Sequence, residues 1–256
     1  MAGPAPETTP PQTVLPRITL VVPVYNEEDN LRTLADEITR AMERVADSAG
    51  RWELLFVDDG STDGSLAVIR QLAAGSPNIR YIALAANRGQ SAAFAAGFRD
   101  ATGELIITLD ADLQNDPADI PAMLALYGRD GTNMVVGWRA DRKDTFAKRL
   151  ASRFGNAVRN WISRDTIKDT GCSLKVMRRD MLLSLPVFIG AHRFYPALMR
   201  LEGAVIAEVK VNHRPRRAGV SKYGIWDRAR KTCLDLLAVR WLQSRHVSYR
   251  IKERSS

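Results

Sequence analysis

The most distinctive chemical feature of the sequence is a pair of aspartates separated by one residue, Asp110 and Asp112, followed by Gln114. The pair directly follows the apolar run 105–109, which is typical of a strand buried inside a sheet. In an extended turn, both carboxylates can reach one hard cation, and the Gln114 amide adds a third oxygen. Mg²⁺ is typically held by one or two carboxylates, water and substrate phosphates. The spacing therefore predicts a site for Mg²⁺ or Mn²⁺ that would hold a diphosphate and stabilise it as a leaving group.

Acidic side chains follow two other apolar runs in the same way. Asp58 and Asp59 come after residues 52–57, and Glu27 and Glu28 come shortly after residues 18–24. In open parallel sheets, ligands bind beyond the carboxyl ends of the strands. Like charges gathered at one such edge repel each other, and a bound cation would relieve that repulsion. We therefore expect these acidic turns to surround one binding site.

The elements that must position these turns alternate between strand and helix patterns. Such alternation predicts a mostly parallel α/β sheet with helices on both faces. The expected strands are 18–24, 52–57, 79–84, 105–109 and 134–136, and the expected helices are 30–45, 65–72, 91–101 and 117–127. Beyond residue 139 we expect a basic helix at 146–162, strands at 173–177 and 205–211, and helices at 193–201 and 226–242. Neither a glycine-rich dinucleotide fingerprint nor a Walker A motif is present.

Composition and charge limit the class of protein further. With 256 residues, 45% of them apolar, the chain is long enough for one domain or at most two. The net charge of +8 is concentrated, because residues 214–256 hold 12 Lys or Arg against three acids. A second basic stretch covers 139–168. Concentrated positive charge indicates an anionic partner. Two cysteines exclude a disulfide scaffold, and no apolar run has the ~20 residues that a membrane span needs.

The ends of the chain differ from its middle. Residues 1–16 are rich in Pro, Thr and Ala and lack the basic start and apolar core of a secretory signal. We expect a disordered leader at 1–16, a catalytic domain at 17–224 and a basic amphipathic helix with its tail at 225–256. The expected location is cytoplasmic, peripheral on the cytoplasmic face of the membrane.

Several motifs together carry a family resemblance. They are 22–28 (VPVYNEE), 57–65 (VDDGSTDGS), 87–89 (NRG), 110–114 (DADLQ), 169–175 (DTGCSLK), 192–194 (HRF) and the pattern RxxGxSKYG at 216–224. This combination resembles family 2 glycosyltransferases, most closely the branch of dolichyl-phosphate mannose synthase and its bacterial polyprenyl-phosphate relatives. The resemblance covers about residues 17–242. It implies a GT-A fold, which is a Rossmann-like α/β architecture.

The resemblance also implies roles for individual residues. The nucleoside would be held by Pro23, Tyr25, Glu27, Val57 and Asp59. The cation and diphosphate would be held by Asp110, Ala111, Asp112 and Gln114, with Val136 nearby. Phosphates of donor or acceptor would contact Arg139, Arg216 and Lys222. On one face of the basic helix, Ser152 with Lys148 or Arg149 would hold the phosphate of a lipid acceptor.

The implied reaction is an inverting transfer from a UDP- or GDP-sugar to a polyprenyl phosphate. A phosphate is already anionic near pH 7, so positioning and charge neutralisation matter more than a strong base. Asp169 is expected either to orient the acceptor or act as a weak base, or to serve as a turn or cap residue. His192 is expected either to touch a phosphate or to be a buried structural histidine.

The final helix suggests how such an enzyme meets a lipid. It combines apolar side chains with basic ones: Trp226, Leu234, Leu237, Val239, Trp241 and Leu242, and Arg228, Arg230, Lys231, Arg240 and Arg245. The pattern is typical of an interfacial helix on an anionic membrane, although the helix could instead simply pack on the domain. A membrane-protein partner or a homo-oligomer stays open.

Other functions fit the sequence less well. A soluble glycosyltransferase acting on a saccharide or protein hydroxyl is the main alternative, but it gives no reason for the paired basic segments. A processive polysaccharide synthase is disfavoured because that class carries a Gln-x-x-Arg-Trp motif, whereas residues 237–241 of this chain (LAVRW) lack the Gln. Nucleic-acid binding is disfavoured because no recognised module accompanies the basic tail.

Overall fold

The computed structural model describes residues 17–45, 52–140, 167–215, 225–247 and 253. Within these ranges, seven strands form one sheet in the order β3-β2-β1-β4-β6-β5-β7. The strands are β1 (Ile18–Val24), β2 (Trp52–Asp58), β3 (Ile79–Ala83), β4 (Leu105–Thr108), β5 (Met134–Trp138), β6 (Lys175–Arg178) and β7 (Ile206–Lys210). All neighbours pair in parallel except β6, which runs antiparallel to both β4 and β5. The predicted mostly parallel sheet is therefore confirmed.

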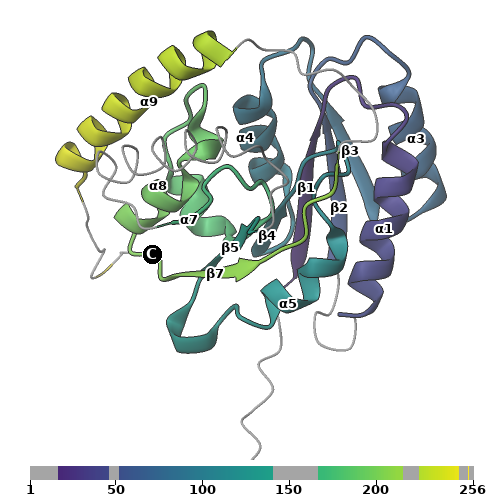
Figure 1. The fold of residues 1–256 in the computed structure, drawn as a ribbon. Coiled ribbons are helices and arrows are strands. Elements are labelled where there is room, and N and C mark those ends of the chain that lie inside the picture. Colours follow the sequence, from purple (N-terminus) through teal and green to yellow (C-terminus); the bar gives the residue numbers. More distant parts are fainter. Residues whose placement is uncertain (1–16, 46–51, 141–166, 216–224, 248–252, 254–256) are drawn as a thin grey trace, which may run out of the picture.

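Helices cover both faces of this sheet, as predicted (Figure 1). The helices α1 (Leu31–Glu43), α3 (Ser65–Gly75) and α5 (Ile120–Leu124) pack on one face, whereas α4 (Gln90–Asp100), α7 (Arg179–Ser184), α8 (Tyr195–Leu201) and α9 (Ile225–Arg245) lie on the other. Alternate residues of β1 serve the two layers: Leu20 and Val22 belong to the core under α1, and Val21 belongs to the core under α4. This period of two is what a strand buried on both faces requires.

Two details differ from the sequence-based expectations, and one expectation is not tested. The helix expected at 117–127 is divided into a 3₁₀ turn, Pro117–Asp119, and the short helix α5, which has Pro121 in its first turn. Proline suits a first turn but cannot donate a backbone hydrogen bond inside a helix. The short helix α7 was not predicted, and the basic helix expected at 146–162 lies outside the described residues.

The reversed direction of β6 brings an additional loop to the ligand-binding edge. In the register of the sheet, Lys175 at the start of β6 lies beside Thr108 at the end of β4. The residues that precede β6 therefore share an edge with the residues that follow β4, which include Asp110 and Asp112. Consequently, the loop 169–174 joins the acidic turns predicted to form the site.

Helix α4 lies unusually close to the sheet at the point where it crosses β1 and β2. A Cβ placed on Gly97 would come within 2.4 Å of a methyl carbon of Val21, so this position has room only for glycine. The close approach fixes the helix relative to the sheet. The first turn of α4, which contains Gln90 and Ser91, is thereby fixed at the carboxyl edge.

A hydrogen-bonded carboxylate secures β2 near its first residue, at the opposite end from this edge. Glu53 accepts hydrogen bonds from the hydroxyls of Thr19 and Thr102 at 2.6 and 2.7 Å and from Arg80 at 2.9 Å. Burial alone would raise the pKa of Glu53, but these hydrogen bonds more than offset it and lower the pKa to about 2. Glu53 is therefore ionised and fully paired at neutral pH.

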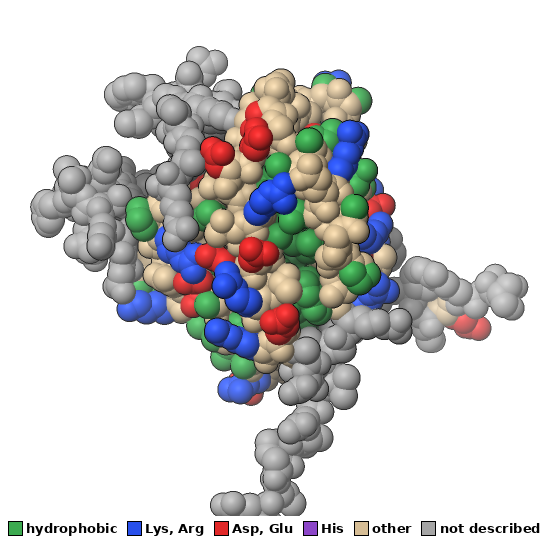
Figure 2. Space-filling view, turned by 90° about the vertical axis from the view of Figure 1, so that its right-hand side faces the viewer, with side chains coloured by type: hydrophobic (Ala, Val, Ile, Leu, Met, Phe, Trp, Pro, Cys, Tyr) green, Lys and Arg blue, Asp and Glu red, His purple; other side chains and the backbone are tan. Residues whose placement is uncertain are grey.

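The surface differs between the two helical layers. On the face over α1 and α3, basic and acidic side chains of the described residues are interspersed (Figure 2). On the other face, the outer side of α9 exposes Leu234, Leu237 and Trp241, each about 60% accessible to solvent. None of the helices in the described part of the chain has the length and apolar character to cross a bilayer.

Candidate active site

Two adjoining cavities open at the carboxyl edge of the sheet. The larger has a volume of about 520 Å³ and is lined by residues of α4, of the turn after β4, of the loop before β6 and of the segment before α8. The smaller, about 220 Å³, is lined by residues that follow β1 and β2 and by the turn after β4. Gln90, Asp110 and Asp112 line both cavities and so form their common wall.

The two aspartates of this wall lie close enough to influence each other. Burial and then the charge of Asp112 raise the pKa of Asp110. Gln90 donates to Oδ1 of Asp110 at 2.6 Å, and the backbone N–H of Gln114 donates to Oδ1 of Asp112 at 3.1 Å. Each carboxylate therefore has a fixed orientation, and Gln114 itself lines the larger cavity.

This donor set fits a hard divalent cation. It consists of oxygen ligands, and the mutual repulsion of two carboxylates is relieved when a cation binds between them. Among the described residues, no three acidic, histidine or cysteine side chains gather into a complete metal site. A cation held by Asp110, Asp112 and Gln114 would therefore take its other ligands from water and from a substrate diphosphate, as Mg²⁺ prefers.

The smaller cavity gathers four of the five residues predicted to hold a nucleoside. Pro23, Tyr25, Glu27 and Asp59 all line it. Glu27 is oriented by the Asn30 amide, which donates to its carboxylate at 2.7 Å. The cavity thus offers an aromatic ring for stacking beside carboxylate acceptors.

Asp59 has a second role that its sequence position did not reveal. Its two carboxylate oxygens accept hydrogen bonds from the backbone N–H groups of Arg88 and Gly89 at 2.7 and 2.8 Å. Gly89 precedes α4 with a φ of 85°, a conformation that favours glycine. Asp59 therefore holds the turn from which α4 begins, in addition to lining the cavity.

A buried lysine supplies positive charge to the larger cavity. Lys175 is 3% exposed, lines the cavity and donates a hydrogen bond to the carbonyl oxygen of Cys172. Burial lowers the pKa of Lys175, whereas the nearby carboxylates of Asp110 and Asp169 act in the opposite direction. The amino group is thus placed where an incoming anion would meet it, and such an anion would favour its charged form.

Arg139 and Asp169 form a bidentate ion pair beside this cavity. Nε and one terminal nitrogen of Arg139 donate to the two carboxylate oxygens of Asp169 at 2.7 and 2.9 Å, and both side chains are nearly buried. Burial lowers the pKa of Arg139, but pairing with Asp169 more than offsets it, so the pKa is raised. The pair holds the guanidinium beside Gly171, a cavity residue, whose added Cβ would lie 3.1 Å from a terminal nitrogen of Arg139.

His192 lines the larger cavity and contacts the first turn of α4. Its Nδ1 lies 2.8 Å from the hydroxyl oxygen of Ser91, and its ring packs beside Phe94 with the centroids 6.4 Å apart. Burial, with smaller contributions from the charges of Arg193 and Lys175, lowers the pKa of His192 to about 3. The imidazole is therefore neutral at physiological pH, and it is both nearly buried and in contact with the cavity.

The structure brings most of the described candidates together, but not all of them. Ala111 lies with the predicted nucleoside residues in the smaller cavity. Val57 and Val136 are fully buried in the core and line neither cavity, so their side chains are not accessible to a substrate. The remaining candidates lie outside the described residues: Lys148, Arg149, Ser152, Arg216 and Lys222.

Several cavity residues were not selected from the sequence. They are Gln90, Phe94, Thr108, Thr170, Gly171, Ser173, Lys175, Arg193 and Tyr195. Most had a sequence signal: Gln90 directly follows the turn at 87–89, Thr170, Gly171, Ser173 and Lys175 lie in the motif at 169–175, and Arg193 lies in the motif at 192–194. Phe94, Thr108 and Tyr195 are recognised only once the fold brings them to the cavity.

Comparison with known proteins gives a consistent result. The profile described as Glycosyl transferase family 2 matches residues 19–185. Dodecaprenyl-phosphate galacturonate synthase of Rhizobium johnstonii is 40% identical over 226 residues, which cover 87% of this chain and 66% of that protein. Undecaprenyl-phosphate 4-deoxy-4-formamido-L-arabinose transferase of Pectobacterium carotovorum is 36% identical over 208 residues, or 80% and 62% of the two chains. The chain thus spans less than two thirds of the length of these relatives.

Solved structures support the fold. Glucosyl-3-phosphoglycerate synthase from Mycobacterium tuberculosis in complex with uridine diphosphate superimposes with a TM-score of 0.65 at 21% identity, covering 88% of this chain and 80% of that one. The same enzyme in complex with Mn²⁺, uridine diphosphate and phosphoglyceric acid gives a TM-score of 0.63 at 20% identity, covering 91% and 80%. At this level of identity, the likeness concerns the fold alone.

Proposed function

The chain belongs to glycosyl transferase family 2 and has its GT-A fold, and from this premise we propose that it transfers a sugar from a nucleotide-sugar to a polyprenyl phosphate. The observation that carries the proposal is the pair of cavities that meet at Asp110 and Asp112. A nucleoside in the smaller cavity would place its diphosphate at the aspartates, and the sugar would then extend into the larger cavity. The acceptor would approach through the larger cavity.

The relatives support the proposed acceptor, and a structural neighbour supports the proposed cation. Two similar proteins are named for sugar transfer to dodecaprenyl and undecaprenyl phosphate. The structural neighbour has been crystallised with UDP together with either Mn²⁺ or Mg²⁺. Because Asp110, Asp112 and Gln114 present hard oxygen ligands, a divalent cation bound there would neutralise the charge of the departing diphosphate.

The reaction is a direct displacement at the anomeric carbon. A phosphate oxygen of the lipid forms the new bond to this carbon while the bond to the nucleoside diphosphate breaks, so the configuration inverts and UDP or GDP leaves. The attacking oxygen already carries negative charge, so no proton has to be removed from it. The protein must hold the two anions in line and reduce their repulsion.

Described residues can meet both requirements. Tyr25, Glu27 and Asp59 would position the nucleoside, and Gln90 keeps Asp110 oriented. On the acceptor side, Lys175 offers a buried amino group whose charged form an anionic phosphate would favour. We assign Asp169 to positioning Arg139 for the acceptor phosphate rather than to proton transfer.

A lipid acceptor also requires contact with a membrane, and we assign this contact to α9. One side of the helix is buried in the core through Leu236 and Val239, so Val239 does not belong to the membrane-facing set expected from the sequence. The outer side exposes Leu234, Leu237 and Trp241.

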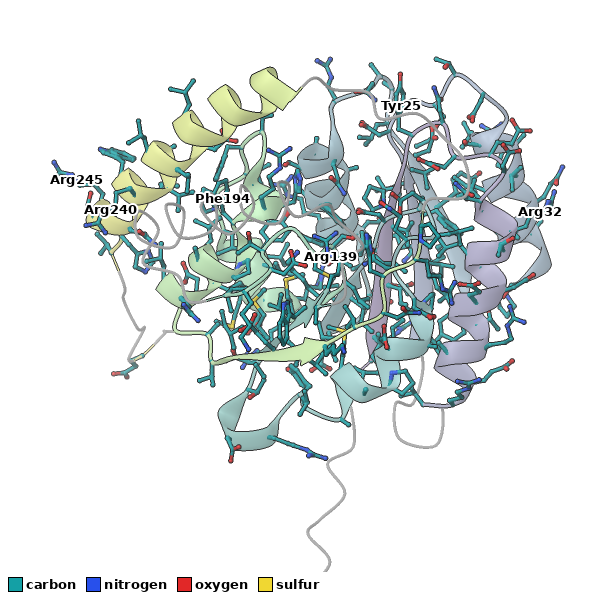
Figure 3. All side chains as sticks on the ribbon, viewed as in Figure 1. Tyr25, Arg32, Arg139, Phe194, Arg240 and Arg245 are labelled. Atoms are coloured by element: carbon teal, nitrogen blue, oxygen red, sulfur yellow. The ribbon has the colours of Figure 1, made fainter. Side chains whose placement is uncertain are left out.

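Basic side chains accompany these exposed apolar groups. Arg240 and Arg245 lie toward the C-terminal end of α9 (Figure 3). In a peripheral interfacial helix, apolar side chains enter the boundary of the lipid tails, and neighbouring basic side chains contact anionic headgroups. The outer side of α9 offers both kinds of side chain. The partner that fits this surface is therefore the cytoplasmic face of an anionic bilayer.

The decisive experiment measures sugar transfer from UDP- and GDP-sugars to a short prenyl phosphate with Mg²⁺ or Mn²⁺. We expect product with the prenyl phosphate and none with the matching prenyl alcohol or with free saccharides. Transfer to an alcohol or saccharide but not to the phosphate would overturn the proposed acceptor. A panel of nucleotide-sugars in the same assay identifies the donor.

A further inference from the structure

The hydrogen bonds around Ser91 determine which nitrogen of His192 carries a proton. The Ser91 hydroxyl oxygen accepts a hydrogen bond from the backbone N–H of Gly190 at 3.0 Å and lies 2.8 Å from Nδ1 of His192. A serine hydroxyl has one proton to donate. If Nδ1 carried a proton, Ser91 would accept twice and its own proton would have no acceptor among the described residues. Ser91 is 7% exposed, and a buried hydroxyl left in that way is unfavourable.

Full pairing therefore requires Ser91 to donate its proton to Nδ1. A neutral imidazole that accepts at Nδ1 carries its proton at Nε2. The lowered pKa of His192 keeps the ring in this neutral form. No hydrogen bond to Nε2 occurs within the described part of the structure, and the ring lines the larger cavity. His192 thus has one N–H group available to a ligand.

The surroundings of His192 indicate what this N–H would contact. His192 lines the cavity together with Lys175 and Arg193, so this part of the wall combines hydrogen-bond donors with positive charge. His192 does not line the smaller cavity, where the nucleoside would bind. A ligand group rich in acceptor oxygens and bound away from the nucleoside fits this wall, and the phosphate of the acceptor is such a group.

We propose that Ser91 holds His192 in the tautomer protonated at Nε2, and that this N–H donates a hydrogen bond to a phosphate oxygen of the lipid acceptor. This assignment rests on the proposed function. It makes His192 an acceptor-binding residue and Ser91 its positioning residue. Lys175 lines the same cavity and would favour the phosphate through its amino group, whereas the neutral N–H of His192 would donate a hydrogen bond of fixed orientation.

The tautomer can be measured without turnover. The chain has three histidines, so the protein labelled with ¹⁵N-histidine gives three imidazole spectra, and a His192→Gln variant identifies the relevant one. We expect a protonated Nε2 and an unprotonated Nδ1 at neutral pH in the wild type, and a mixture of tautomers in Ser91→Ala. Adding a short prenyl phosphate should shift the Nε2–H signal, whereas the matching prenyl alcohol should not. A proton on Nδ1, or an equal response to both compounds, would overturn the proposal.

Kinetics test the same contact from the side of the substrate. His192→Ala should raise KM for the prenyl phosphate roughly 10- to 100-fold, the range for a lost hydrogen bond to a charged group, with KM for the nucleotide-sugar unchanged. His192→Gln, which keeps an N–H near the position of Nε2, should recover part of the loss. His246→Ala is the matched control, because His246 is exposed and pairs only distantly with Glu202 at 4.0 Å.

The failures of the two proposals are distinguishable. If the wild-type protein transfers no sugar to any prenyl phosphate, the proposed function is wrong. If the wild type is active but His192→Ala keeps the wild-type KM for the lipid, or changes KM for the nucleotide-sugar instead, the assignment of His192 is wrong and the proposed function stands.

Discussion

Replacing Asp169 with asparagine separates a positioning role from a catalytic one. The ion pair between Asp169 and Arg139 is bidentate, and the two side chains are only 11% and 12% exposed. Removing one charge leaves the guanidinium nearly buried without its partner, which typically costs 3–5 kcal/mol. Because asparagine retains one acceptor oxygen, we expect the lower end, about 3 kcal/mol of lost unfolding free energy. That value corresponds to more than a hundred-fold change in the unfolding equilibrium constant.

The matched control is a second aspartate–arginine pair on the surface. Arg178 and Asp180 also form an ion pair, but their side chains are 47% and 63% exposed. An exposed pair contributes about 0–1 kcal/mol, so Asp180→Asn should change stability little. Urea unfolding at neutral pH, followed by tryptophan fluorescence, compares the two variants, and a shared m value makes the midpoints comparable. Equal losses in the two variants would refute the argument from burial.

Activity measurements complete this test. If Asp169 positions Arg139, the asparagine variant should be slower and should bind the prenyl phosphate more weakly, while the pH dependence of kcat stays that of the wild type. If Asp169 removes a proton, the variant should instead lose the rise of kcat with pH. This second outcome would restore the role of weak base that the sequence left open and would refute our interpretation of the ion pair.

Three further outcomes are expected. Asp112→Asn should lower cation-dependent transfer at least a hundred-fold without changing the circular dichroism spectrum, and retained activity would remove Asp112 from the cation site. Glu53→Gln should lower the free energy of unfolding by about 3 kcal/mol at pH 7 and by about half of that at pH 3. The reason is that the pKa of Glu53 is lowered from 4.5 to about 2, so its contribution to stability is fully present above pH 4.5 and is lost as the pH falls toward 2. A loss that does not depend on pH in urea unfolding would contradict this. Leu237→Asp should weaken flotation with anionic vesicles, whereas Tyr81→Asp, an exposed control on β3, should not; equal effects would argue against α9 as the membrane contact.

The sequence predicts the sheet well because each strand has a local signature. The runs at Ile18–Val24 and Trp52–Asp58 are apolar on both faces, and the structure confirms both strands. The direction of a strand has no such signature. Nothing in Lys175–Arg178 distinguishes an antiparallel strand from a parallel one, so the reversal of β6 follows only from its pairing with β4 and β5.

The candidate site is predictable to the extent that its chemistry is local. Asp110 and Asp112 are two residues apart, and their shared cavity wall follows from the end of β4. The contact between Ser91 and His192 joins residues 101 positions apart, and no spacing rule indicates it. Val57 and Val136 were predicted as site residues from the family resemblance, but their side chains are fully buried. A resemblance assigns roles to positions in the sequence and does not indicate whether a side chain there is accessible.

The ion pair between Arg139 and Asp169 also has a consequence for how this enzyme can diversify. Arg139 follows β5 and Asp169 precedes β6, so their contact joins two positions that are 30 residues apart in the sequence. Closing a loop becomes only slowly less favourable with length, by about 0.6 kcal/mol for each doubling. Because the ion pair already brings positions 139 and 169 together, a change in the number of residues between them should cost the fold little free energy, so related chains can differ in length here while the sheet is kept.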